Sequence, residues 1–370
     1  MSRSHALFDQ CYECGDKKFH NIWQAFDCQK QTGHFPQYRF DQEFIESIKN
    51  IKRPKNLSHQ YIKNLIVTSL KKLRSQYQYL RLALGGGTDS YSILKYCVQN
   101  DIYLDEVFTY MVSIDPNNVK SNIEYLPAIN YAKQHVGKTI GNVLLLHPTI
   151  KDYECVFDKD WLENTNYVRG SQLPGRITNA VSRWYDKTNV PLDRSLTIFG
   201  LDKPYIENIN GKMYWTHFDL ATAELMGCQH TLPLFFDKNN PELSVAMTYG
   251  LLENSDTSNN IIGFDTQPKH KKINIIKNMG LESTGHHYID QHLLGKSVFD
   301  SESIKASLAK KELINLGRQD ILDAYNTTIE NCIKKYSSLP HALEIKSNKT
   351  IKTVARYTEK IPIYQDSFGS

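Results

Sequence analysis

At 370 residues, the chain is long enough for one large domain or two moderate domains, and its 40% hydrophobic residues can fill a sizeable core. Its 44 basic and 40 acidic side chains leave a net charge of +4, which permits a nucleic-acid partner without indicating one. No stretch reaches the roughly 18 apolar residues of a membrane span, and the first residues lack the apolar centre of a signal peptide. These features exclude a membrane protein and predict a cytoplasmic one.

The first 57 residues predict a polar and aromatic N-terminal extension. The seven cysteines of the chain are odd in number and scattered, which is not the pattern of a disulfide framework. Cys11 and Cys14 form a CxxC pair, with His20 and Cys28 behind them, so four residues of the types that bind zinc fall close together. Their spacing matches no common zinc finger. Zinc and ordinary thiols both stay open for this segment.

The next region, residues 58–225, alternates between helical and strand patterns. IKRPKN at 51–56 reads as a linker, and Ser58 is the predicted N-cap of a helix with an apolar stripe. Leucines alternate with other residues over 79–84, which predicts a strand that ends at three glycines, and apolar residues recur at helical spacing over 93–98.

Three further apolar runs predict strands: EVFTYMVSID at 106–115, NVLLLH at 142–147 and SLTIFGLD at 195–202. Pro127 and Gly137 mark the start and end of a helix between the first two runs, and a helical segment near 171–186 precedes the third. This order predicts an α/β fold with a parallel sheet and crossover helices. From residue 226 to 370 the pattern predicts a mainly helical part that completes or covers the site.

The glycine-rich stretch LALGGGTDSYSILKYC at 82–97 is the strongest functional signal. A strand that ends in glycines and leads into a helix presents backbone N–H groups to an anion, and phosphate is the expected guest. The Walker A loop and the GxGxxG dinucleotide loop are both excluded by the spacing. The alternative is a flexible turn without a ligand.

GGGTDS resembles the SGGxDS loop of the PP-loop ATP pyrophosphatases, a superfamily that includes the synthetase domain of asparagine synthetases, argininosuccinate and GMP synthetases, and tRNA thiolation enzymes. The resemblance implies a doubly wound parallel sheet whose loop binds the pyrophosphate part of ATP. It implies that the Asp89 carboxylate binds Mg²⁺ and that Ser90 donates a hydrogen bond to phosphate. The residues carried over as ATP-binding are Gly85, Gly86, Gly87, Thr88, Asp89 and Ser90. Gly85 stands where the family has Ser, and Tyr91 stands where a second Ser or Thr is common.

A second segment, FGLDKPYI at 199–206, is similar to the G-x-D-E segment of asparagine synthetases. The resemblance implies that Gly200 lies at the ATP site and that Asp202 shares Mg²⁺ with Asp89, since ligands of a doubly wound sheet bind at the carboxyl ends of its strands. Lys203 replaces the family's Glu and is expected to stabilise the departing pyrophosphate as a catalytic cation, with Asp89 as the other catalytic residue. The alternative is a solvated turn.

Three weaker signals complete the set. Tyr110 and Met111 lie where the family binds adenine through backbone groups, and Asp115 is either a ribose ligand or a turn former. GHHYIDQH at 285–292 is either a metal cluster or a polar surface segment. NGKMYWTHFDLATAELMG at 210–227 lines an acceptor pocket or packs in the core.

The resemblance implies an ATP-dependent ligase that adenylates a carbonyl or carboxylate substrate, releases pyrophosphate and accepts a nitrogen nucleophile. Residue 2 is Ser, and few residues precede the loop, so a glutaminase domain like that of asparagine synthetases is not expected. The layout also resembles PP-loop proteins of bacteriophages, which would place the chain in a host cytoplasm. Two alternatives stay open: a PP-loop enzyme that modifies tRNA or DNA bases, and a degenerate nucleotide-binding protein with an interaction role. The acceptor and the oligomeric state are not indicated.

Overall fold

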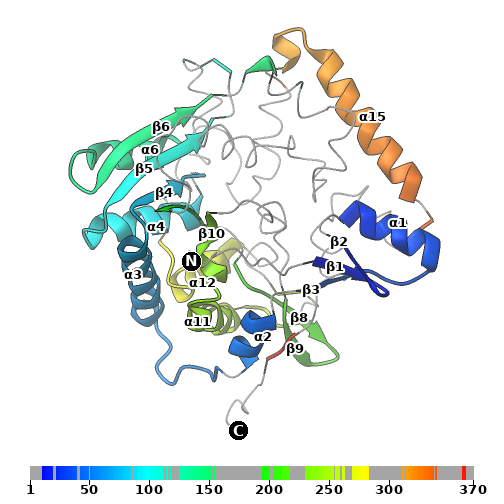
Figure 1. Ribbon diagram of the computed structural model, residues 1–370. Helices are drawn as coiled ribbons and strands as arrows, with labels where there is room; N and C mark the ends of the chain where they lie inside the picture. Colours follow the sequence, from blue (N-terminus) through cyan, green and yellow to red (C-terminus); the bar gives the residue numbers. More distant parts are fainter. Residues whose placement is uncertain are drawn as a thin grey trace.

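The computed structural model of the chain is built around a five-stranded parallel sheet in the order β10-β7-β4-β5-β6 (Figure 1). Its strands are β4 (Tyr79–Ala83), β5 (Leu104–Tyr110), β6 (Ile140–Leu146), β7 (Ser195–Phe199) and β10 (Thr231–Pro233). From β4 the chain winds through β5 to β6 on one side, and then through β7 to β10 on the other. The predicted α/β fold with a parallel sheet is confirmed, and its direction reverses between β4 and β7.

Several segments between the elements are not described. The described residues are 11–19, 22–39, 42–49, 51–85, 87–111, 114, 115, 117, 125–147, 149–151, 154, 194–200, 203–216, 230–253, 255–258, 261, 262, 269–282, 311, 313–336, 338, 339 and 361–363. The predicted helix near 171–186 and the histidine-rich segment at 285–292 lie outside them. In the part of the chain that is described, no helix has the length and apolar character needed to cross a membrane.

Three helices cover one face of the parallel sheet: α3 (His59–Gln76), α4 (Thr88–Gln99) and α6 (Leu126–Gln134). Their buried side chains share a core with Leu80 and Leu82 of β4. The predicted helix start at Ser58 is confirmed, because its side chain accepts a hydrogen bond from the Tyr61 N–H at 3.2 Å. Pro127 lies in the first turn of α6, as predicted.

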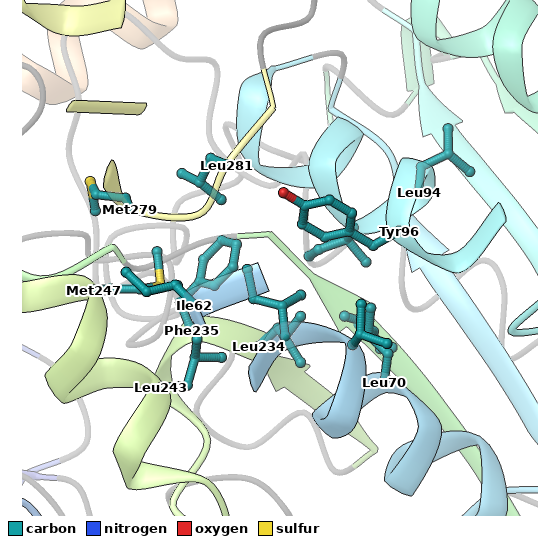
Figure 2. Close-up of a cluster of buried hydrophobic side chains, with 14 of the residues drawn as sticks. Ile62, Leu70, Leu94, Tyr96, Leu234, Phe235, Leu243, Met247, Met279 and Leu281 are labelled. Carbon is teal, nitrogen blue, oxygen red and sulfur yellow. The ribbon is translucent and has the colours of Figure 1, made fainter. Parts of the chain in front are cut away.

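The same core continues past residue 225. The one-turn 3₁₀ helix η2 (Leu234–Phe236), α11 (Pro241–Leu252) and α12 (Lys269–Asn278) pack beside α3 and α4. Figure 2 shows their side chains meeting: Ile62, Leu70, Leu94, Tyr96, Leu234, Phe235, Leu243, Met247, Met279 and Leu281. Helix α11 confirms the helix predicted for ELSVAMTYGLLE, whereas β10 and η2 show that the residues after 225 also build the sheet and its core.

A four-stranded antiparallel sheet, in the order β11-β8-β9-β12, lies outside the predicted pattern. Strands β8 (Tyr205–Ile209) and β9 (Lys212–Thr216) form a hairpin whose two turn residues, Asn210 and Gly211, have φ of 51° and 82°. The short strands β11 (Ile261–Ile262) and β12 (Ile361–Pro362) flank it. Trp215 of the NGKMYWT segment is 2% exposed, so this side chain packs in the core.

The N-terminal segment forms a small antiparallel sheet with two helices. The sheet has the order β2-β1-β3, from β1 (Cys11–Cys14), β2 (Lys17–Phe19) and β3 (Gln37–Arg39), and its helices are α1 (Ile22–Thr32) and α2 (Gln42–Lys49). Helix α15 (Gln319–Tyr336), which confirms the helix predicted for DILDAYNTTIENCIKKY, lies against α1 (Figure 1). The Lys335 Nζ lies 2.9 Å from the Asp27 Oδ2, and the rings of Phe26 and Tyr336 are 5.5 Å apart.

The second face of the parallel sheet carries a buried ion pair. Arg81 of β4 is opposite Glu106 of β5, and its Nε donates to the Glu106 Oε1 at 2.8 Å. The guanidinium also lies over the Phe108 ring, 4.5 Å from its centroid. Burial raises the pKa of Glu106, while the Arg81 charge lowers it, and the net shift is upward. Desolvation of this carboxyl group therefore outweighs its attraction to Arg81.

Candidate functional site

The predicted site segments meet where the sheet reverses direction. The glycine loop follows β4, and Gly200 follows β7, the neighbouring strand in the sheet. A Cβ built on Gly200 would lie 2.5 Å from the Ser90 nitrogen, so the backbones of the two loops are in direct contact. Ligands of doubly wound sheets bind in the crevice that opens at this point, outside the carboxyl ends of the strands.

The glycine loop is open on the side that precedes helix α4. Gly85 and Gly87 are exposed, and a Cβ built on Gly87 would meet no atom within 4 Å. Gly87 is the N-cap of α4, and no side chain caps the helix; the first helical hydrogen bond runs from the Tyr91 N–H to the Gly87 oxygen at 3.1 Å. The first turn of α4 therefore combines room for a ligand with the positive end of a helix dipole. Gly86 lies outside the described residues.

Ser90 stabilises the loop from within. Its hydroxyl accepts a hydrogen bond from the Gly85 N–H at 3.1 Å and donates to the Gly87 oxygen at 3.5 Å. The side chain is buried, so the hydroxyl is directed into the turn and not away from it. The prediction that Ser90 donates to phosphate therefore requires this hydroxyl to change partners, while its backbone N–H lies in the first turn of α4.

Asp89 forms an ion pair with Lys203 across the two loops. The Lys203 Nζ lies 3.0 Å from the Asp89 Oδ2, and the two side chains are 14% and 19% exposed. A lysine from the loop after β7 therefore reaches the first turn of α4. Asp202, the predicted second ligand of Mg²⁺, lies outside the described residues. The Asp89 carboxylate is an oxygen ligand of the kind that Mg²⁺ prefers, and Lys203 competes for it.

Helix α4 is held in place by the segment that follows α12. The Tyr96 hydroxyl donates to the Gly280 oxygen at 2.5 Å, and Lys95 Nζ lies 3.0 Å from the Glu282 Oε2. The Glu282 N–H donates to the Ser92 hydroxyl at 2.8 Å. Sequence reasoning missed these contacts, because no local pattern relates positions so far apart. They fix the direction in which the first turn of α4 points.

Tyr91, in the first turn of α4, packs against a neighbouring helix. Its ring meets the Tyr131 ring of α6 edge to face, with centroids 5.6 Å apart. Tyr91 also packs against the core that the three helices share with the sheet. The side chain therefore joins α4 to α6.

The structure describes the residues predicted to bind adenine and ribose, which are Tyr110, Met111 and Asp115. The Met111 N–H donates to the Leu146 oxygen at 2.8 Å, and its side chain is buried in a second core, so only its carbonyl oxygen fits the predicted contact. Tyr110 ends β5 and continues the ladder with β6. The Asp115 Oδ1 accepts a hydrogen bond from the Asn117 N–H at 2.8 Å, which is the turn-forming alternative.

The CYEC pair lies on β1, and side chains three positions apart on a strand point to opposite faces. Cys11 and Cys14 are both buried. The Cys14 thiol donates to the His34 oxygen at 3.3 Å, and the Cys28 thiol donates to the Cys14 oxygen at 3.6 Å. Burial, followed by the neighbouring Cys28, raises the pKa of Cys14 to about 11. Within the described ranges, no three His, Cys, Asp or Glu side chains are grouped to hold a metal ion.

No protein-family model matches the sequence, and a search of the curated proteins finds no match. The class of the protein therefore rests on its fold, which is an α/β fold with a Rossmann-like core of five parallel strands flanked by helices.

The close approach of the two loops can be tested with two alanine variants. Gly200→Ala is expected to destabilise the protein by about 1–3 kcal/mol, because the new methyl group overlaps the Ser90 backbone. Gly87→Ala is the matched control: it has negative φ and open space, so its stability is expected to stay within about 1 kcal/mol of wild type. Urea unfolding of both variants measures the difference, and equal stabilities would contradict the contact.

Proposed function

We propose that this protein is an ATP-dependent enzyme of the PP-loop type that adenylates a carbonyl or carboxylate substrate. The observation that carries the proposal is the pairing of Asp89 with Lys203 beside an open glycine loop, where the sheet reverses direction. This arrangement combines an anion-binding helix terminus, a cation and a carboxylate in one place. The similarity of GGGTDS and GLDK to the motifs of the family supports the choice of ATP over other phosphates.

In this reaction, a substrate oxygen attacks the α-phosphorus of ATP, and the bond from that phosphorus to the β-phosphate oxygen breaks. The first turn of α4 and Lys203 would bind the leaving pyrophosphate, whose negative charge grows as the bond breaks. Asp89 would hold Mg²⁺, which neutralises phosphate charge when it is bound. A nitrogen nucleophile then displaces AMP from the adenylated substrate. Positioning and charge suffice, so no nucleophilic side chain is required.

The test is to measure ATP binding and pyrophosphate release with the full-length protein. Binding is followed by calorimetry with ATP and Mg²⁺, and release is followed across a panel of carboxylic acids and nucleobases with ammonium as the nucleophile. Asp89→Asn is expected to weaken ATP binding at least about tenfold. The matched control is Asp101→Asn, which removes the charge of an exposed aspartate. The backbone at Asp101 has a φ of 53°, a conformation that asparagine also adopts, so the fold is expected to stay unchanged.

The outcomes separate the alternatives. Wild-type protein that does not bind ATP, or an Asp89→Asn variant that binds it equally well, would contradict the proposal. Binding without release of pyrophosphate on any substrate would favour the nucleotide-binding alternative suggested by Gly85. The alternative of a tRNA- or DNA-modifying enzyme stays a prediction, and adding tRNA and DNA to the panel tests it.

A further inference from the structure

A concavity away from the glycine loop lies between α2, the linker at 51–53, β9, α11 and β12. Its volume is about 340 Å³, which is within the range of small-molecule sites. Neither the described residues of the glycine loop nor Gly200 and Lys203 line this concavity. Figure 1 shows α2, α11 and β9 close to one another, and β12 contacts both α2 and β9. The linker that the sequence predicts between two structural parts therefore forms one wall of a pocket.

The floor of the pocket is apolar and rigid. It is formed by buried side chains from four elements: Ile48, Trp215, Val245 and Ile361. The Trp215 ring stacks on the Phe236 ring, with centroids 5.3 Å apart and an angle of 23° between the planes. Phe44 packs against both rings. Trp215 is therefore held in place by two other rings, and a lining that includes an aromatic side chain suits a flat apolar ligand.

The rim of the pocket is basic. Among the described residues that line it, the charged ones are all cations: Lys49, Lys52 and Arg53. Lys49 pairs with Glu46 and Arg53 pairs with Glu253, each at 2.9 Å, but neither glutamate lines the pocket. These pairs are partly exposed, so each is weak and can exchange its carboxylate for an anionic ligand.

Arg53 connects the rim to a second aromatic wall. Its guanidinium carbon lies 5.7 Å from the centroid of the Tyr249 ring, which also lines the pocket. The cation is therefore held near the cavity by the ring on one side and by Glu253 on the other. An anion that enters the pocket could pair with the Arg53 guanidinium without a large movement of this side chain.

We infer that this pocket binds a small organic anion with a flat apolar body, whose carboxylate or phosphate meets the basic rim. The apolar body of the ligand would displace water from the apolar side chains, which favours binding. The cations of the rim would pair with the anionic group, which a half-buried charge requires. A neutral ligand would gain only the burial of its apolar surface, and a cationic ligand would be repelled by the basic rim. This inference does not depend on the proposed reaction with ATP.

The experiment is calorimetric titration of the full-length protein with four probes. Phenyl phosphate and benzoate carry the two anionic groups on one flat ring, benzyl alcohol is the neutral analogue, and inorganic phosphate lacks the ring. At least one of the two aromatic anions is expected to bind at least about tenfold more tightly than either control probe. The preference between phenyl phosphate and benzoate identifies which group the rim recognises.

The matched variants replace exposed or half-exposed cations only, so the fold is retained. The double variant Lys52→Met/Arg53→Met is expected to weaken binding of the preferred anion by about tenfold or more. Lys71→Met/Lys72→Met removes two lysines of α3 outside the pocket and is expected to leave it unchanged. Absence of binding by both aromatic anions, equal binding of benzyl alcohol, or equal losses in the two double variants would overturn the inference. The titration contains no ATP, so its outcome does not depend on whether the protein has the proposed enzyme activity.

Discussion

Replacing Lys203 by methionine is expected to let the nucleotide-free protein bind Mn²⁺ about tenfold to a hundredfold more tightly, while weakening its affinity for ATP. In the structure, the Lys203 ammonium lies 3.0 Å from the Asp89 carboxylate, so a metal ion must displace one cation to reach the same oxygen. A hydrogen bond between charged groups contributes about 1.5–3 kcal/mol, which sets the size of the gain. Calorimetric titration with Mn²⁺ alone and then with ATP measures both affinities.

Three variants control this experiment. Lys203→Arg keeps a cation beside Asp89 and is expected to leave the affinity for Mn²⁺ near that of wild type. Asp89→Asn is expected to abolish Mn²⁺ binding, with or without the change at Lys203. Lys138→Met removes an exposed lysine elsewhere and accounts for the change in net charge. An unchanged Mn²⁺ affinity in Lys203→Met would show that the ion pair does not control access to the Asp89 carboxylate.

The parallel sheet and the glycine loop are predictable because their signals are local. Buried strands leave continuous apolar runs, such as SLTIF in β7, and the helices between them leave apolar residues at helical spacing. Ser58 marks the start of α3 by its own side chain. The glycine loop and the loop at Gly200 both follow the carboxyl ends of parallel strands. Their contact can therefore be predicted once these two strands are taken to be neighbours in the sheet.

Contacts between side chains from distant elements leave no such signal. The Asp89–Lys203 pair depends on loop conformations that the motifs alone do not specify. Arg81 is an extreme case: the alternation over 79–84 is typical of a half-exposed strand, yet this side chain is fully buried because Glu106 lies opposite it. One missed element did have a local signal, since Asn-Gly at 210–211 is typical of a two-residue hairpin.

Removing one member of the Arg81–Glu106 pair is expected to destabilise the fold by about 3–5 kcal/mol. The two side chains are 0% and 7% exposed, so a charge that loses its counter-charge cannot reach water without opening the sheet. Glu106→Gln keeps the size of the side chain and removes only its charge. Urea unfolding measures the loss, with Glu46→Gln on the exposed face of α2 as a control expected to change stability by about 0.5 kcal/mol or less.

Replacing both members, in Arg81→Met/Glu106→Leu, is expected to restore the stability of wild type or exceed it. The upward shift in the pKa of Glu106 shows that desolvation outweighs the attraction of Arg81, and buried ion pairs of this kind are replaceable by apolar side chains.

The stability that Glu106 contributes depends on pH. Because the folded-state pKa lies above the unfolded-state value, the contribution of Glu106 is largest below the unfolded-state pKa and falls as pH rises through the folded-state pKa. The advantage of the double variant should therefore grow as the pH rises from the unfolded-state pKa of a glutamate, about 4.3, through the higher folded-state pKa of Glu106. A double variant as unstable as Glu106→Gln would show that the charges themselves hold the sheet together.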